Sequence, residues 1–187
     1  MNAAALLLAA AASLITAPDT WRGETFDFPL RFAPGIPYEG QEHVRFNPKW
    51  DQFADEEGFS YVFFWDVKAV PVEPPDLEDH LETYFNGLMA NVSRGRGLDP
   101  PAKSVVAAHP MAQLRGWRQG FGVEIRTFNS FSKNEPLLLR GEVVQRECGN
   151  GRMQIAFALS RSPRDKPIWK ELRKVRDGIT CGPAPVK

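Results

Sequence analysis

The sequence predicts an α+β domain, in which two helices pack on a mostly antiparallel sheet. Two stretches show helical spacing of apolar residues, one stretch is apolar enough for a central strand, and three C-terminal stretches are joined by short turns. We expect a single domain over residues 18–187, after an N-terminal signal segment over residues 1–17. A chain of about 170 residues buries roughly 70 % of its unfolded surface, which is enough for one hydrophobic core.

The opening stretch MNAAALLLAAAASLITAPDTW carries no charged residue from Ala3 to Ala17. A membrane-spanning helix needs about 20 apolar residues, so this run is too short to cross a bilayer. An apolar core followed by small residues is typical of a secretory signal peptide, although no basic residue precedes it here. Cleavage after Ala17 and cleavage after Ala12 are both open, and the A-x-A rule favours the second. The alternative is a buried N-terminal helix.

The chain contains two cysteines, Cys148 and Cys181. They would pair in an oxidising compartment, so they agree with export and with a periplasmic or secreted location. A bridge between them would close a loop of about 33 residues and stabilise the fold by roughly 3–4 kcal/mol. Their spacing suits neither a redox C-x-x-C motif nor a zinc site. The alternative is two unpaired thiols.

Two stretches predict helices. In residues 76–92 the apolar side chains follow one helical stripe, and Asp76 is placed to cap the start. In residues 165–179 a second apolar stripe runs beside a basic face, with Asp165 as the expected cap and Gly178 as the stop.

The remaining stretches predict strands. Residues 59–70 are apolar at both alternating sets of positions, which is typical of a central strand covered on both sides. Residues 24–32 and 104–108 are also expected to be strands. Three more expected strands cover residues 121–131, 137–148 and 152–161. Their short connections predict an antiparallel meander, with one apolar face beneath both helices and an opposite face of mixed charge.

The charges of the chain balance, with 23 Lys and Arg against 23 Asp and Glu. Proteins that bind nucleic acid usually carry a basic excess, so we expect no nucleic-acid partner. The sequence contains no phosphate-binding loop and no nucleophile-elbow motif, and its glycine-rich stretch GWRQGFG lacks the context of a dinucleotide fingerprint. We therefore expect no cofactor, no metal and no catalytic residue strong enough to name a reaction.

Two histidines are nevertheless candidates for chemistry. His80 lies four residues after Asp76, so the two share a helix face and could hold part of a metal shell. His43 lies near Glu39 and Glu42 and could act as a base that a carboxylate orients. The alternative for His80 is a solvated helix face, and the alternative for His43 is a polar residue that enters a strand. A hydrolase-like enzyme that uses His43 or His80 as acid or base is therefore the second hypothesis.

A binding face is the preferred hypothesis. Arg126 and Arg140 are expected on the polar face of the sheet, near Trp117, where they could hold an acidic or sugar-like ligand. Trp50 belongs to an aromatic-rich loop that could line a small cleft at the sheet edge. The alternatives are an ordinary charged surface and a plug for the edge. We expect a non-catalytic binding or interaction module, whose partner is a small ligand or an envelope protein.

Two stretches resemble parts of uncharacterised bacterial exported proteins of unknown function: FDFPLRFAPGIPYEGQEHVRFNPKWDQFADEEGFSYVFFWDV and FALSRSPRDKPIWKELRKVRDGITC. The pattern is F-P-L-x-F-A-P, then Y-x-G-x-E, a Trp-rich strand and a closing W-x-x-L-R helix. This resemblance implies a secreted or periplasmic domain, and it brings no catalytic residues. The order of strands and helices is also similar to small α/β/α sandwiches that serve as accessory or binding modules, although a fold does not by itself give a function.

Overall fold

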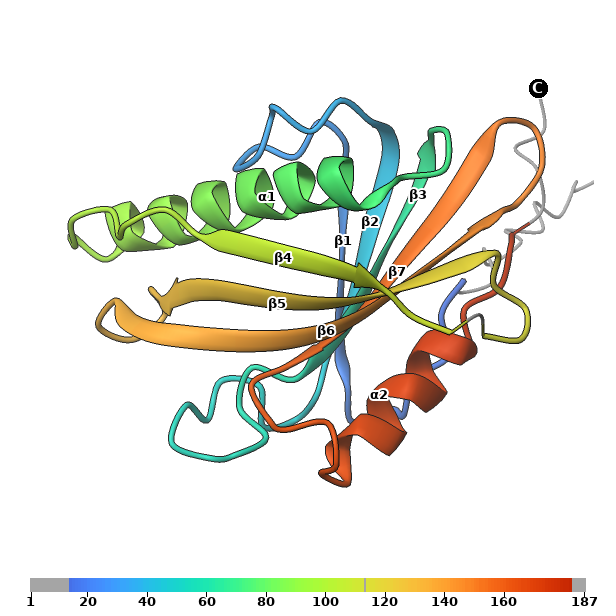
Figure 1. Cartoon of the computed structure of the whole chain (residues 1–187). Coiled ribbons are helices and arrows are strands. Elements are labelled where there is room, and N and C mark those ends of the chain that lie inside the picture. The colour runs from blue at the N-terminus through green and yellow to red at the C-terminus, as the bar shows by residue number, and fades with distance from the viewer. Residues whose placement is uncertain (1–13, 113, 183–187) are drawn as a thin grey trace, which may run out of the picture.

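The computed structural model describes residues 14–112 and 114–182, which form one seven-stranded sheet and two helices (Figure 1). The elements in chain order are β1 (Arg22–Asp27), β2 (Glu39–Phe46), β3 (Tyr61–Lys68), α1 (Pro74–Gly95), β4 (Val105–Pro110), β5 (Gln119–Asn129), β6 (Glu135–Glu147), β7 (Arg152–Ser160) and α2 (Ile168–Asp177). The strand order across the sheet is β1-β2-β3-β7-β6-β5-β4, and every neighbouring pair is antiparallel. The predicted α+β class is confirmed.

The two helices cover opposite faces of the sheet (Figure 1). Leu81 of α1 packs in one apolar core with Phe63, and Trp169 of α2 packs in the other with Phe64. The expectation that both helices share one apolar face is therefore wrong. The sheet has an apolar surface on each side, because its central strands carry apolar side chains at both alternating sets of positions.

Strand β3 is the clearest case of this two-sided packing. Phe63 and Trp65 face α1, Val62 and Phe64 face α2, and all four side chains are 0 % exposed. Its neighbour β7 alternates in the same way, with Phe157 in the α1 core and Ala158 in the α2 core. The prediction of a central strand covered on both sides is confirmed.

The helix boundaries differ from the expected ones at the N-terminal ends. α1 begins at Pro74, because proline is tolerated in a first turn whose N–H groups have no partner within the helix. Asp76 therefore lies inside the first turn and does not cap the helix. α2 begins at Ile168 after Pro167, so Asp165 lies before the helix and does not cap it either.

The N-terminal segment and the disulfide both belong to the α2 side of the sheet. Ile15 is 2 % exposed and packs in the α2 core, and the carbonyl of Leu14 accepts a hydrogen bond of 2.8 Å from the amide of Thr180. Cys148 and Cys181 form a disulfide, with their Cα atoms 5.4 Å apart, as predicted. Residues 1–13 of the expected signal segment lie outside the described residues. Within the described part of the chain, neither helix is long and apolar enough to span a membrane.

Candidate functional site

An apolar cavity of about 330 Å³ lies between α1 and the end of the sheet that β1, β2 and β3 form. Much of its wall is aromatic, with rings from Phe46, Trp50, Tyr61 and Phe131. The rings also contact one another, since the Trp50 ring centre is 4.7 Å from that of Phe46 and 5.3 Å from that of Phe131. Such walls bury the apolar surface of a ligand, and few polar groups then decide how the ligand is oriented.

The alternation of strand residues builds this cavity. Glu42 and Val44 of β2 both line it, because residues two apart in a strand face the same side. Arg22 and Glu24 of the edge strand β1 also line it, and Glu24 lies directly opposite Val44 in the sheet register. Strand β1 is exposed along its whole length, so Arg22 and Glu24 form the mouth of the cavity, and Glu42 lies at its inner end.

Glu42 is the buried polar group of the cavity wall, and its residue is 0 % exposed. Its Oε2 accepts a hydrogen bond of 2.7 Å from the indole N–H of Trp65, and its Oε1 accepts one of 3.1 Å from the hydroxyl of Tyr84. Burial raises the pKa of Glu42 to about 7, although both hydrogen bonds oppose this shift, and the nearby Glu24 adds to it. Near neutral pH the carboxyl group therefore exists in both protonation states.

The mouth of the cavity carries one cation and one anion that face each other. The Nε atom of Arg22 lies 3.7 Å from an Oε1 of Glu24, and both side chains are largely exposed. The guanidinium group of Arg22 also lies over the rings of Phe46 and Trp50, at 5.3 Å and 5.6 Å from their centres. An exposed pair of this kind adds little stability, so its main effect is on the charge that a ligand meets.

Of the four residues that the sequence suggested for ligand binding, Trp50 lines the cavity. Arg126 is exposed on β5, and Nη1 of Arg140 donates a hydrogen bond of 3.0 Å to the carbonyl of Arg161. Trp117 is buried in the α2 core, with the guanidinium group of Arg146 over its ring at 4.4 Å. The structure therefore does not bring these four side chains into one site.

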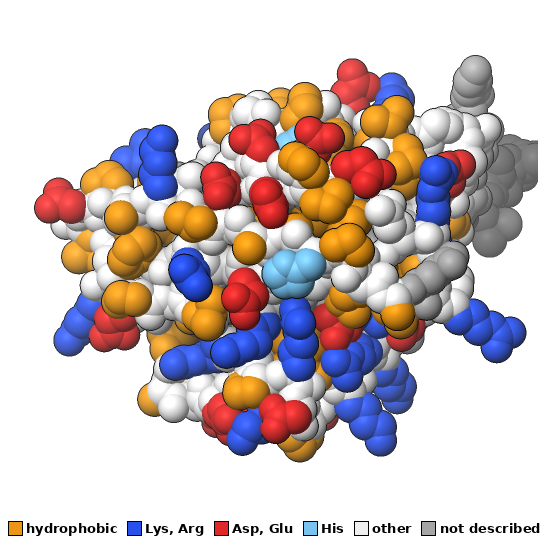
Figure 2. Space-filling model, in the orientation of Figure 1, with side chains coloured by type: hydrophobic (Ala, Val, Ile, Leu, Met, Phe, Trp, Pro, Cys, Tyr) orange, Lys and Arg blue, Asp and Glu red, His pale blue; other side chains and the backbone are white. Residues whose placement is uncertain are grey.

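Arg126 and Arg140 belong to a mixed surface. Figure 2 shows Lys and Arg side chains over β5 and β6, with Asp and Glu side chains among them. Glu124 lies directly opposite Arg140 in the register of these two strands. The expected open face of mixed charge is therefore present only in part, because α2 covers Glu142 and Val144 of the same face. Trp50 lies on the other side of the sheet.

His43 does not use Glu42 as a partner, because neighbouring residues of a strand point to opposite faces. Its ring stacks on Phe64 at 4.7 Å, and its Nδ1 lies 3.2 Å from the hydroxyl of Thr25. Burial lowers the pKa of His43, and its buried Nε2 has no hydrogen-bond partner among the described residues. The nearby carboxylate of Asp66 is instead paired with Arg152. The carboxylate whose charge acts on His43 is therefore engaged by Arg152.

His80 lies on α1, and its Nδ1 is 3.1 Å from the hydroxyl of Tyr38. Burial lowers the pKa of His80, although Asp79 and Asp76 oppose the shift. The described residues contain no group of three or more His, Cys, Asp and Glu side chains placed to hold a metal ion. His80 therefore contacts a phenol and does not belong to a metal-holding cluster of the described residues.

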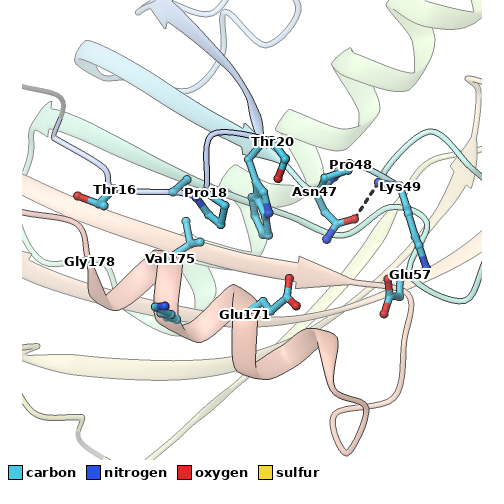
Figure 3. A pocket seen from close by; sticks show the side chains of 13 residues that line it. Thr16, Pro18, Thr20, Asn47, Pro48, Lys49, Glu57, Glu171, Val175 and Gly178 are labelled. Atoms are coloured by element: carbon cyan, nitrogen blue, oxygen red, sulfur yellow. Dashed lines mark hydrogen bonds and ion pairs between the residues drawn. The ribbon is translucent and has the colours of Figure 1, made fainter.

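A larger, more open cleft of about 870 Å³ lies between residues 16–21, the loop after β2 and α2 (Figure 3). Lys49 lines this cleft and forms ion pairs with Asp55 at 3.3 Å and Glu57 at 3.1 Å. The side-chain oxygen of the buried Asn47 accepts a hydrogen bond of 2.8 Å from the amide of Lys49. Lys49, Glu57 and Asn47 of this cleft thus interact with one another, whereas the smaller cavity is lined by an acid with a perturbed pKa. We place the candidate site in the smaller cavity for this reason.

The comparisons with known proteins add no assignment: no family model matches the chain, and no curated protein or solved structure matches it either.

Glu42 is the residue that the sequence interpretation missed, since it entered only as a partner of His43. A signal was present in the pattern of the strand, because Glu42 shares its alternate positions with Val44 and Phe46. An acid in line with apolar residues indicates a carboxyl group that faces the core.

Proposed function

We propose that this chain is an exported, non-catalytic binding domain that holds a small, largely apolar ligand in the cavity between α1 and strands β1–β3. The observation that carries the proposal is the position of Glu42, a buried carboxyl group in the wall of an otherwise mainly apolar cavity. The apolar walls would supply most of the contact area, and the carboxyl end would select the orientation of the ligand.

The groups near Glu42 favour binding over catalysis. Burial raises the pKa of Tyr61 and the pKa of Tyr84, and the charge of Glu42 raises both further. Both phenols are therefore protonated at neutral pH, and they can donate or accept hydrogen bonds that orient a ligand.

Export is supported by two independent features. Cys148 and Cys181 are joined by a disulfide, and structural disulfides persist in oxidising compartments such as the periplasm and the extracellular space. The apolar opening of the sequence predicts a signal segment that would direct the chain there.

A cavity-filling variant tests the proposal. Naphthalene, an apolar probe without a head group, is expected to bind the wild-type protein in ligand-observed NMR. Leu88 lines the cavity, so Leu88→Trp should fill it and abolish this binding. Asn91→Trp adds the same ring at an exposed position of the same helix and should leave the binding unchanged. Absence of naphthalene binding to the wild type, or equal binding to Leu88→Trp, would overturn the proposal.

A further inference from the structure

The charged groups around the cavity are unevenly distributed. Arg22 lies at one end of the mouth, over the ring of Trp50. Glu24 pairs with Arg22 there, whereas Glu42 lies further along the cavity, directly opposite Phe26 in the register. Glu24 is also one of the groups that disfavour ionisation of Glu42. Glu42, unlike Glu24, forms no ion pair with a described residue, so a ligand cation would balance its charge when the carboxyl group is ionised.

This acidic end also has unused hydrogen-bond acceptors. Glu42 accepts one hydrogen bond from Trp65 and one from Tyr84. A carboxylate can accept about four, so both oxygen atoms keep acceptor capacity. An ammonium group presents three donors and no acceptor, so it is complementary to this arrangement.

The walls next to the acids are aromatic. Phe26, Phe32 and Tyr84 all line the cavity, and the rings of Phe32 and Tyr84 are 5.0 Å apart in an edge-to-face arrangement. Ring faces attract cations, and they contribute roughly 0.5–2 kcal/mol according to how far the cation is desolvated. Neutral and anionic head groups gain no such attraction, and an anion would be repelled by Glu24 and Glu42.

We infer that the cavity binds a small apolar amine in its cationic form, with the ammonium group beside Glu42 and Glu24 and the apolar body against the aromatic walls. This inference rests on the proposed function and names the ligand class of the same cavity. A second source of selectivity is size, since a cavity of about 330 Å³ is at the lower end of the range for small-molecule sites.

Three ligands of one shape test the inference. They are 1-naphthylmethylamine, 1-naphthylmethanol and 1-naphthoate, which present a cation, a neutral group and an anion on the same ring system. Isothermal titration calorimetry at pH 7.5 with the full mature protein should show the amine binding at least ten-fold more tightly than the alcohol, and the naphthoate most weakly. A ratio of ten corresponds to about 1.4 kcal/mol.

Variants of three acids connect this preference to the cavity. Glu42→Gln keeps the size of the side chain, and it should weaken amine binding at least ten-fold while changing alcohol binding less than two-fold. Glu24→Gln, at the exposed mouth, should weaken amine binding about three-fold. Glu39→Gln is the matched control, because Glu39 lies on the same strand as Glu42 but pairs with Lys68 at the surface and should change nothing. Circular dichroism and thermal melting would check that each variant is folded.

The possible results separate the inference from the proposed function. Equal affinity for the amine and the alcohol, with both abolished by Leu88→Trp, would overturn the amine inference and leave the binding function standing. No binding of any naphthyl compound, naphthalene included, would overturn both. An amine preference that persists in both Glu42→Gln and Glu24→Gln would overturn the assignment of these two acids.

Discussion

Glu42 and Trp65 lie directly opposite each other on β2 and β3, and the indole N–H donates a hydrogen bond of 2.7 Å to the carboxyl group. Both residues are 0 % exposed. The register of the two strands therefore places an acid and its donor in the core together, and Tyr84 of α1 supplies the second donor from above. A group that three elements hold in this way has a fixed orientation toward the cavity.

Replacing Glu42 should change how stability depends on pH. Burial raises the pKa of Glu42 from its ordinary value of 4.5 to about 7. The folded state therefore binds this proton more tightly than the unfolded state, and stability is lost as the pH rises from 4.5 to 7. Glu42→Gln removes this titration. Its free energy of unfolding relative to the wild type should rise by on the order of 3 kcal/mol between pH 4.5 and pH 8, as urea denaturation can measure.

Glu39→Gln is the control for this pH dependence. The hydrogen bond and charge of Lys68 lower the pKa of Glu39, so this group favours the folded state above the unfolded pKa and loses that effect in acid. Its variant should show a small difference of the opposite sign. Parallel pH profiles of the wild type and Glu42→Gln would contradict the prediction for Glu42.

The N-terminus of the mature protein should begin upstream of Leu14. Cleavage after Ala17 would remove Ile15 from the α2 core and the bond from Thr180 to Leu14, whereas cleavage after Ala12 keeps both. Ile15→Ala should lower the free energy of unfolding by about 2–4 kcal/mol, because Ile15 is 2 % exposed. Thr16→Ala, at an exposed position, should change it little. A mature chain that mass spectrometry finds to begin at Pro18 would refute this boundary.

The disulfide should stabilise the α2 side without affecting the cavity. Replacing both Cys148 and Cys181 by serine releases a loop with a sequence separation of 33 residues. Loop entropy then predicts a loss of about 3–4 kcal/mol in urea denaturation. Binding of naphthalene should be retained at temperatures where the variant is folded, since the cavity lies on the α1 side. Two labelled thiols in the unfolded, unreduced wild type would show that the bridge is absent.

Two glycines of α1 should respond in opposite directions to alanine. A Cβ atom on Gly87 would lie 1.8 Å from the backbone oxygen of Phe32, so the helix and the segment before β2 would have to separate. Gly87→Ala should lower stability by roughly 1–3 kcal/mol, as overpacked positions do. A Cβ atom on Gly95 would meet nothing within 4 Å, and Gly95→Ala should be neutral or stabilising by up to about 1 kcal/mol. Thermal unfolding of both variants gives the comparison.

The elements that could be predicted from the sequence are those whose local pattern is strong. The stripe of α1, which includes Leu77 and Leu81, and the apolar run of β3 are each visible within a window of about a dozen residues. Strand β2 was not predicted as a full strand, because Glu42 interrupts the apolar alternation that Val44 and Phe46 continue. Its identity depends on pairing with β3, which is a long-range contact.

The placement of α2 could not be predicted for a related reason. Charged residues of β6 indicated a solvated face, but Glu142 is 3 % exposed and accepts hydrogen bonds from Arg173 and Arg176 of α2. The pairing of buried charges across two elements is invisible to a pattern along one strand. The same limit applies to the candidate site. Trp50 was predicted to line a cleft and lines the cavity, whereas Arg126 and Arg140 were also predicted to bind a ligand and do not line it.

The hydrogen bond between Thr180 and Leu14 holds the two ends of the described chain close together, which matters for attaching the protein to a surface. Both ends of the described chain lie on the side of the sheet that α2 covers, while the cavity opens on the opposite side at the edge strand β1. A tether attached at either end would therefore hold the molecule on a sensor chip with its cavity pointing away from the support. Immobilisation and ligand capture would not compete for the same surface.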